Sequence, residues 1–186
     1  EMYKQKPFFI VFEGVEGCGK SYQSKKLQNN LKKKKIKTLL TREPGGTKSA
    51  ELIRNLILKD YFNKDTKNKF DKYTDTLLYL AARNEHIKTK IKPALLGNTV
   101  VIWDRFIDST LAYQVYGKKV SMKFISSIHK FILNGVKPNL TFILKVSNKS
   151  AKRRLRKRRT KNRYDNFAQS FYTNAQKTFI KIAKNK

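Results

Sequence analysis

Phosphate-binding chemistry is indicated by one segment of the chain, Gly14-Val15-Glu16-Gly17-Cys18-Gly19-Lys20-Ser21. Its glycines, lysine and serine have the spacing of a phosphate-binding loop. Glycines let backbone N–H groups converge on a polyphosphate, and the dipole of a following helix adds a positive field. We expect Lys20 to reach the β- and γ-phosphates of a nucleoside triphosphate, and the Ser21 hydroxyl to ligate Mg²⁺. A chance loop between a strand and a helix is the alternative.

The residues around this loop favour the phosphate-binding interpretation. Phe8 to Phe12 is a short apolar run, rich in aromatic and β-branched residues, that ends at a glycine. Such a run is typical of a buried parallel strand. Beyond Ser21, Leu27 and Leu31 lie four residues apart in a stretch without glycine or proline, which indicates a helix. The sequence therefore predicts the strand, loop and helix that phosphate binding needs.

The rest of the chain repeats this alternation of elements. Apolar runs predict strands at 36–40, 99–103 and 140–144. Helical patterns follow Thr47 and occupy 71–96, 122–133 and 171–183. Strands alternating with helices indicate an α/β fold with a parallel sheet flanked by helices. A length of 186 residues suits one domain, 1–186, with a sizeable core.

Two of the predicted strands are followed by charged residues at the sheet edge where ligands bind. Arg42 and Glu43 come after the second strand, and Asp104 and Arg105 after the third. Ligands of parallel sheets lie at the carboxyl ends of the strands. Asp104 therefore has the position of the carboxylate that holds Mg²⁺ or its waters in phosphate-loop enzymes. For the first pair, a structural turn in which Thr47 caps the next helix is the alternative.

Two aromatic side chains lie one helical turn from a polar partner. Tyr79 and Arg83 are four residues apart and share a helix face, where a ring and a guanidinium can hold a base and a phosphate. Ser109 and Tyr113 have the same spacing. We expect His86 to be a packing or capping residue, because the sequence has no His/Cys cluster for a metal site.

The charge of the chain is strongly positive, with 43 Lys and Arg against 13 Asp and Glu, a net charge of +30. Such a field attracts polyanions, so a nucleic-acid partner has to be weighed. The lysines are spread along the whole chain, which favours a general compositional bias over a nucleic-acid footprint. We expect no specific nucleic acid partner.

One basic segment stands out, with nine Lys and Arg residues between Lys152 and Arg163. It can be a nucleic-acid arm, a solvated helix, or a lid, about 152–168, that grasps phosphate. Nine like charges disfavour an isolated helix without an anion nearby. The phosphate loop has no cation besides Lys20, so charge on a transferred phosphoryl group needs arginines from elsewhere. These considerations favour the lid.

Cellular location is indicated by cysteine usage and hydropathy. Cys18 is the single cysteine, which excludes an internal disulfide and fits a reducing cytoplasm. We expect it to be a small residue tolerated in the loop rather than a redox switch. No apolar run approaches the roughly eighteen residues of a membrane span. Because the first predicted strand closely follows residue 1, we expect no signal peptide.

Four motifs follow one another along the chain: the phosphate loop, Thr41-Arg42-Glu43-Pro44-Gly45-Gly46-Thr47, Ala81-Ala82-Arg83-x-x-His86, and Asp104-Arg105-Phe106-x-x-Ser109-x-x-Ala112-Tyr113-Gln114. In their order and spacing, the chain resembles bacterial thymidylate kinases from about Phe8 to Ala183. The resemblance implies the fold of phosphate-loop nucleoside monophosphate kinases and transfer of the γ-phosphoryl group of ATP to dTMP, in dTTP biosynthesis. It also implies a homodimer and the cofactor Mg²⁺.

The resemblance implies a role for each matching residue. The ATP phosphates would be held by residues 14–21, which are Gly14, Val15, Glu16, Gly17, Cys18, Gly19, Lys20 and Ser21. Glu16 would also face the deoxyribose 3′-hydroxyl. Tyr79 would stack on thymine, Ser109 and Gln114 would contact the base edge, and Tyr113 would close the space beneath C2′. Arg83 and Arg105, with Arg42 beside them, would clamp the acceptor phosphate, and Asp104 would organise Mg²⁺. Arg154 would pack on adenine, and the lid would supply Arg156, Arg158, Arg159 and Arg163.

The sequence departs from the family pattern at three places. Tyr79 stands where a Phe is usual, and Lys145 where an Asp is common. The family normally continues into a fifth strand, an adenine-contacting loop and a final helix, which we do not expect within these 186 residues, whether the sequence is incomplete or naturally short. We therefore expect an uncovered sheet edge.

The alternatives are another nucleoside or nucleotide kinase of this fold, or a nucleic-acid-binding ATPase. A monophosphate acceptor suits an arginine clamp, whereas a nucleoside hydroxyl would need a base.

Overall fold

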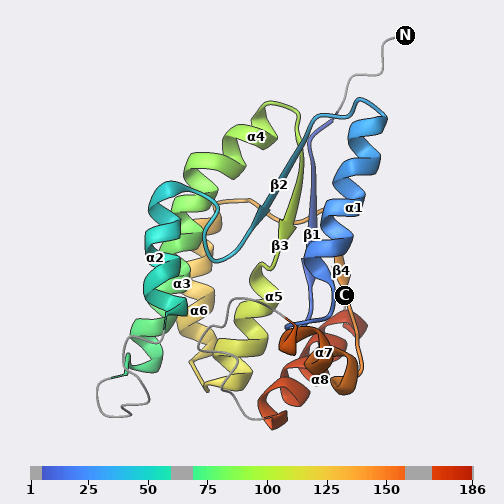
Figure 1. Cartoon of the computed structure of the whole chain (residues 1–186). Coiled ribbons are helices and arrows are strands. Elements are labelled where there is room, and N and C mark those ends of the chain that lie inside the picture. Colours follow the sequence, from blue (N-terminus) through green and yellow to red (C-terminus); the bar gives the residue numbers. More distant parts are fainter. Residues whose placement is uncertain (1–5, 60–68, 158–168, 186) are drawn as a thin grey trace.

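The chain forms a parallel sheet that carries the phosphate loop at one end. A computed structural model describes residues 6–59, 69–157 and 169–185. Its strands are β1 (Phe8–Glu13), β2 (Thr38–Arg42), β3 (Val100–Asp104) and β4 (Leu140–Ile143), in the order β2-β3-β1-β4 (Figure 1). All pairings are parallel. The predicted α/β fold class is confirmed.

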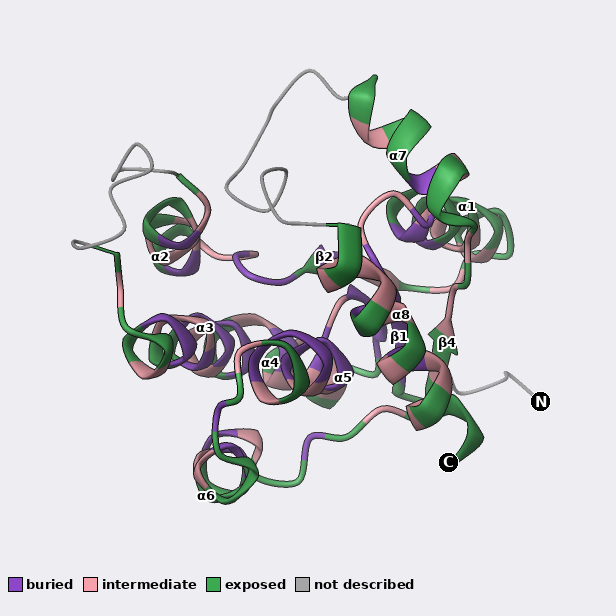
Figure 2. Cartoon of the chain, turned by 90° about the horizontal axis from the view of Figure 1, so that it is seen from below, coloured by how far each residue is buried: buried purple, intermediate pink, exposed green. Residues whose placement is uncertain are grey.

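Helices lie on both faces of the sheet. The helices are α1 (Lys20–Lys33), α2 (Lys48–Leu58), α3 (Lys72–His86), α4 (Lys92–Leu96), α5 (Ile107–Thr110), α6 (Met122–Leu133), α7 (Asn148–Arg156) and α8 (Gln169–Lys184). Seen from below in Figure 2, α1 lies on one side of the strands, and α3, α4 and α5 lie on the other. Both α2 and α6 pack against α3. Two π-helical segments, η1 (Ile87–Ile91) and η2 (Leu111–Gly117), continue α3 and α5.

Alternate residues of the central strands supply the cores of the two faces, as the pleat of a strand requires. One face packs against the side chains of η1 and the start of α5, and its buried residues include Phe9, Val11, Val101, Trp103, Ile87, Ile91 and Phe106. The other face packs against α1 through Ile10, Phe12, Ile102, Leu27 and Leu31. Both central strands are therefore held from two sides, which fixes the loops at their carboxyl ends.

Two predicted elements differ from the structure. The second strand begins at Thr38 rather than Ile36, because the Ile36 N–H donates to Leu31 O at 3.0 Å and closes α1 instead. The predicted helix 71–96 is continuous but contains the π-helical segment η1. This segment ends two residues before Pro93 of α4, and a proline lacks the N–H of a regular helical hydrogen bond.

The hydrogen bonds of the structure define one helix start and one edge of the sheet. Thr47 accepts a hydrogen bond from Ala50 N at 3.2 Å and so caps α2, the structural role that the sequence offered as an alternative. Within the described residues β4 pairs only with β1, and Leu140 and Phe142 on β4 are each 41% exposed. In the same described part of the chain, none of the helices has the length and apolar character needed to cross a bilayer.

Candidate active site

The phosphate loop joins β1 to α1 and lies directly against α7. Gly17 has φ +75°, and a Cβ built on it would lie 2.8 Å from the Ala151 backbone oxygen. A residue with a side chain would therefore push α7 away from the loop. Arg154 of α7 donates a hydrogen bond to Gly17 O at 3.0 Å. The loop and the first turn of the basic segment are one packed unit.

Lys20 is the first residue of α1, at the end of this loop, and is buried. Its ammonium donates to Gly14 O and Val15 O, both at 3.0 Å, and lies 3.7 Å from Cys18 Sγ. Ser21, the next residue, donates its hydroxyl to Asp104 Oδ2 at 2.8 Å. The two residues predicted to ligate Mg²⁺ are thus brought together from segments 83 positions apart.

A cavity of about 530 Å³ opens beside the loop. Every predicted substrate-binding residue lines it, together with residues from the loop, β3 and α7. The predicted residues in its wall are Glu16, Gly17, Gly19, Lys20, Ser21, Arg42, Tyr79, Arg83, Asp104, Arg105, Ser109, Tyr113, Gln114 and Arg154. Gly14, Val15, Cys18 and Arg156 do not line the cavity.

Arg105 crosses from the end of β3 to the phosphate loop. Its backbone has φ 71°, a left-handed conformation that non-glycine residues rarely adopt and that marks functional sites. The guanidinium pairs with Glu16 at 2.8 Å, donates to Gly14 O at 3.1 Å and lies 5.4 Å from the Tyr113 ring. Burial lowers the pKa of Arg105, but Glu16 and other nearby groups raise it further, so its net pKa lies above the ordinary value. Arg105 is a fixed positive charge in the cavity wall.

Arg83 belongs to a buried network. It donates from Nε to both Glu43 oxygens at 3.0 and 2.9 Å, and from Nη2 to Glu43 Oε2 at 2.6 Å. Nη2 also donates to Phe106 O at 3.0 Å, and Nη1 lies 2.7 Å from His129 Nε2. A guanidinium has five N–H groups. This network uses four of them: the single N–H of Nε, one N–H of Nη1 and both N–H groups of Nη2. Arg83 therefore holds three segments together at the cavity wall.

The electrostatics of this network depend on burial. Burial raises the pKa of the Glu43 carboxyl, and the charge and hydrogen bonds of Arg83 counteract that rise. Burial, with the charge of Arg83, lowers the pKa of His129 to about 3. His129 is therefore neutral and able to accept a hydrogen bond from Arg83 at neutral pH.

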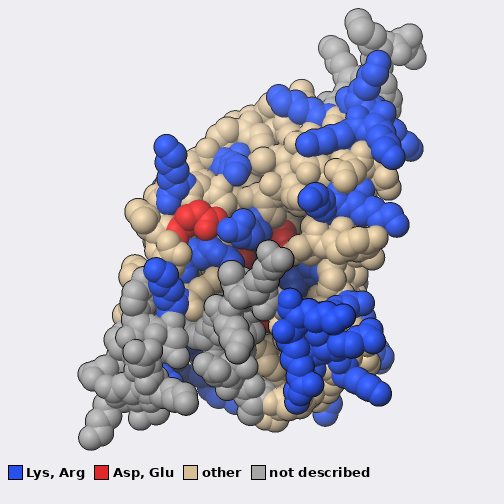
Figure 3. Space-filling model, viewed as in Figure 1, with Lys and Arg blue, Asp and Glu red and all other residues tan. Residues whose placement is uncertain are grey.

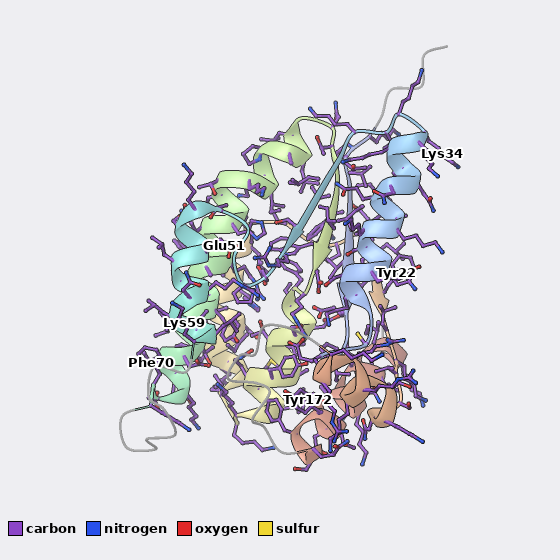
Figure 4. The ribbon with its side chains drawn as sticks, in the orientation of Figure 1. Tyr22, Lys34, Glu51, Lys59, Phe70 and Tyr172 are labelled. Atoms are coloured by element: carbon purple, nitrogen blue, oxygen red, sulfur yellow. The ribbon has the colours of Figure 1, made fainter. Side chains whose placement is uncertain are left out.

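Arg42 is placed differently from Arg83, on the open side of the cavity. It pairs with Glu51 of α2 at 3.1 Å, and its side chain is 53% exposed (Glu51 is labelled in Figure 4). Glu51 also accepts from Gly46 N at 2.9 Å, so it fixes the loop between β2 and α2. Arg54 of α2 lines the cavity and donates to Pro44 O at 2.6 Å.

The predicted base-binding residues lie on α3 and on the helix after Arg105. Tyr79 is half-buried, and Tyr113 and Gln114 are buried. Ser109 is also buried, and its hydroxyl donates to Glu13 at 2.6 Å and accepts from Arg105 at 3.2 Å. Three of these side chains come from the α5–η2 helix, which places them along one wall.

The basic segment forms α7 at its start. Lys and Arg side chains gather over α7 on the face shown in Figure 3, and Asp and Glu are few there. Arg156, at the end of α7, is exposed. Arg158, Arg159 and Arg163, predicted for the lid, lie outside the described residues.

His86 is a packing residue, as predicted. Its ring lies edge-on to Trp103 with centroids 4.6 Å apart, and its Nε2 is 2.7 Å from Thr41 Oγ1. Burial, with the charges of Lys90 and Arg83, lowers the pKa of His86 to about 3.

Sequence reasoning missed several residues of the site. Glu13 and His129 hold site residues in place, and Arg54 and Thr110 line the cavity. Arg54 had a signal, because a cation occupies a helix face between the apolar residues Ala50 and Ile57. The signal for Glu13 was weaker, namely an acidic residue at the end of an apolar strand. No spacing pointed to His129.

A phosphate loop that shares one cavity with arginines from separate segments is the arrangement of a phosphate-loop nucleoside monophosphate kinase. The comparisons with known proteins agree. The profile of the thymidylate kinase family matches residues 12–186. The chain belongs to the thymidylate kinase family, an ATP-dependent family of nucleoside monophosphate kinases.

Individual relatives are similar over most of the chain. The thymidylate kinase of Mycoplasma capricolum is 39% identical over 95% of this chain and 82% of its own length. That of Wolbachia pipientis is 41% identical over 94% of this chain and 84% of its own. The crystal structure of thymidylate kinase from Ehrlichia chaffeensis superposes with a TM-score of 0.75 at 34% identity. It covers 97% of this chain and 82% of that one.

Proposed function

We propose that this protein transfers the γ-phosphoryl group of ATP to dTMP, giving dTDP and ADP. The observation that carries the proposal is that one cavity is lined both by residues of the phosphate loop and by every residue expected to bind the acceptor. Membership of the thymidylate kinase family supports the same reaction. Catalysis would consist mainly of positioning and charge neutralisation, because the acceptor phosphate is already a competent nucleophile.

The ATP phosphates would bind at the loop and at the start of α1. Lys20 would exchange its bonds to the Gly14 and Val15 carbonyls for bonds to phosphate oxygens. Ser21 and Asp104 present a hydroxyl and a carboxylate side by side, the oxygen ligands that suit Mg²⁺. Bound there, Mg²⁺ would neutralise charge on the β- and γ-phosphates. Arg154 would pack against adenine from α7.

The acceptor phosphate would bind at Arg105. In the structure Arg105 pairs with Glu16, so a phosphate dianion would compete with that carboxylate for the guanidinium. Glu16 would then be available to the deoxyribose 3′-hydroxyl. Arg83 has few N–H groups left outside its network, so we assign Arg105 the larger share of the acceptor clamp. Arg42, exposed and paired with Glu51, would contribute from the open side.

The base would occupy the part of the cavity between α3 and the α5–η2 helix. Tyr79 would stack on thymine, Ser109 and Gln114 would lie at its edge, and Tyr113 would exclude a ribose 2′-hydroxyl. A buried tyrosine ring against the Arg105 guanidinium is a rigid wall for that exclusion. We propose that Arg156, Arg158 and Arg163 stabilise the charge of the transferred phosphoryl group.

We also propose that the protein is a cytoplasmic homodimer. Apolar side chains are exposed on three neighbouring helices, at Leu52 (69%) and Leu56 (44%) of α2, Leu77 (46%) of α3 and Phe131 (79%) of α6. Association of a second copy over these helices would cover this surface. Light scattering at micromolar concentration should give twice the monomer mass. The cytoplasm is where ATP and dTMP are available.

The test of the acceptor assignment is the variant Arg105→Ala. In a coupled assay of ADP release with Mg²⁺ and ATP, the wild type should turn over dTMP and the variant should not. Titration of the variant with a fluorescent ATP analogue should give affinity close to that of the wild type. Equal loss of dTMP turnover and of nucleotide affinity would contradict the role given to Arg105.

A further inference from the structure

Glu13 is an acidic side chain in the core of the sheet. It is the last residue of β1, directly before the phosphate loop, and its side chain is fully buried. The carboxylate accepts hydrogen bonds from Phe106 N at 2.7 Å, Ser109 N at 3.1 Å and the Ser109 hydroxyl at 2.6 Å. Burying a carboxylate costs free energy unless it is fully hydrogen-bonded, so this site is built around it.

The start of α5 needs this carboxylate. The first amides of a helix have no acceptor within it, and a Ser, Thr, Asp or Asn at the preceding position usually supplies one. α5 is preceded by Phe106, whose side chain cannot accept a hydrogen bond. Glu13 supplies the acceptor from a segment more than 90 residues away. Burial raises the pKa of its carboxyl, and the hydrogen bond from Ser109, the charge of Arg105 and the hydrogen bond from Phe106 N counteract that rise.

The same carboxylate fixes the direction of the Ser109 hydroxyl. A hydroxyl has one hydrogen, and Ser109 donates it to Glu13 Oε2. A Ser109 lone pair is then left for Arg105, whose Nη1 donates to Ser109 Oγ at 3.2 Å. A relay therefore runs from Glu13 through Ser109 to Arg105, the residue with the left-handed backbone.

We propose that Glu13 is a positioning residue of the acceptor site, which holds the Arg105 guanidinium in place through the Ser109 hydroxyl. The inference rests on the proposed function, since Arg105 is the expected ligand of the acceptor phosphate. Glu13 does not line the cavity and so acts through these neighbours rather than on a substrate. Ser109 then serves Arg105 in addition to any contact with the base.

The variant Glu13→Gln tests the relay with little change of shape. Its amide oxygen can still accept from the Phe106 and Ser109 amides, but an NH₂ group replaces the oxygen that accepts from the Ser109 hydroxyl. The Ser109 hydrogen then has no acceptor at position 13 and must turn elsewhere, so the direction of the lone pair that accepts from Arg105 is no longer fixed. We expect KM for dTMP to rise about ten-fold or more, with KM for ATP changed less than about two-fold.

A matched control is Glu85→Gln, because Glu85 also accepts from a serine hydroxyl, that of Ser49, at 2.8 Å on the exposed surface. It should leave both KM values unchanged. Ser109→Ala removes the relay while leaving Glu13 and its amide bonds, and should show the same selective rise. If Glu13→Gln does not fold, Glu13→Asp carries the test, because its shorter side chain withdraws the carboxylate from the Ser109 hydroxyl and leaves any contact of Ser109 with the base in place. The double variant should be no worse than the more impaired single variant, because both changes break one path.

The outcomes separate this inference from the proposed function. If the wild type turns over dTMP and Glu13→Gln changes both KM values equally or neither, Glu13 does not position the acceptor site. Additive losses in the double variant would likewise overturn the relay. If the wild type uses a different acceptor, the proposed function is wrong, and the selective rise should then appear for that acceptor.

Discussion

The buried pair of Arg83 and Glu43 predicts a large stability loss from a small chemical change, Glu43→Gln. The two side chains are 3% and 6% exposed, and Arg83 makes hydrogen bonds of 2.6, 2.9 and 3.0 Å to the Glu43 oxygens. Removing the charge of one partner from a buried pair costs about 3–5 kcal/mol. Because the amide oxygen still accepts a hydrogen bond, we expect about 3 kcal/mol for Glu43→Gln.

The chain offers a control with the same chemistry and different burial. Glu51 pairs with Arg42 at 3.1 Å, but the two side chains are 38% and 53% exposed. Glu51→Gln should cost less than about 1 kcal/mol, the usual range for an exposed pair. For a chain of this size 1 kcal/mol shifts the melting temperature by about 2–4 °C, so the two variants should differ visibly.

Urea unfolding at pH 7, followed by circular dichroism, measures both losses. Burial raises the pKa of the Glu43 carboxyl, so the competing possibility is that it is protonated in the folded protein. A protonated Glu43 would make Gln a near-isosteric replacement. Equal losses for Glu43→Gln and Glu51→Gln would therefore refute the ionised pair.

Two further variants test other parts of the structure. Gly17→Ala should destabilise the fold and raise KM for ATP, because the new Cβ would displace α7. Gly135 is the control, since it has φ +81° and open space around a built Cβ. Gly135→Ala should therefore show only the backbone cost of about 1 kcal/mol. Equal stability and unchanged KM for ATP in both would show that α7 does not pack on the loop. Burial and the charge of Arg83 lower the pKa of His129 to about 3, so the unfolded chain binds a proton as pH falls below about 6.5 and the folded chain does not. Wild-type stability should fall by about 2 kcal/mol more than that of His129→Gln between pH 7 and pH 5 in urea unfolding, and parallel losses would contradict a neutral buried His129.

Local signals predicted much of the fold. The strand, the phosphate loop and the helix from Phe8 to Lys33 are adjacent in sequence, so composition and glycine spacing were sufficient to predict them. The start of β2 was misplaced because Ile36 closes α1 through a backbone hydrogen bond, which no hydropathy pattern reveals. The π-helical segment before Pro93 interrupts a pattern that reads as one helix.

The site was predictable as a set of residues but not as a network. Motif spacing identified many residues of the cavity wall, including Arg83 and Arg105, but not Arg54 or Thr110. The partners of Arg83 lie 40 and 46 residues away along the chain, at Glu43 and His129. Such pairings depend on how helices pack across the sheet, and a single sequence does not record that packing. Glu13 was missed for the same reason, since its partners are more than 90 residues away.

The central proposal is that dTMP binds in this cavity and receives the γ-phosphoryl group of ATP there. The measurement that tests it most directly is coupled ADP release with Mg²⁺ and ATP, supplying dTMP, dUMP, dCMP, dAMP, dGMP or thymidine in turn. We predict turnover with dTMP well above every other acceptor and none with thymidine, because an arginine clamp recognises a monophosphate. Turnover with thymidine, or preference for another monophosphate, would contradict the account.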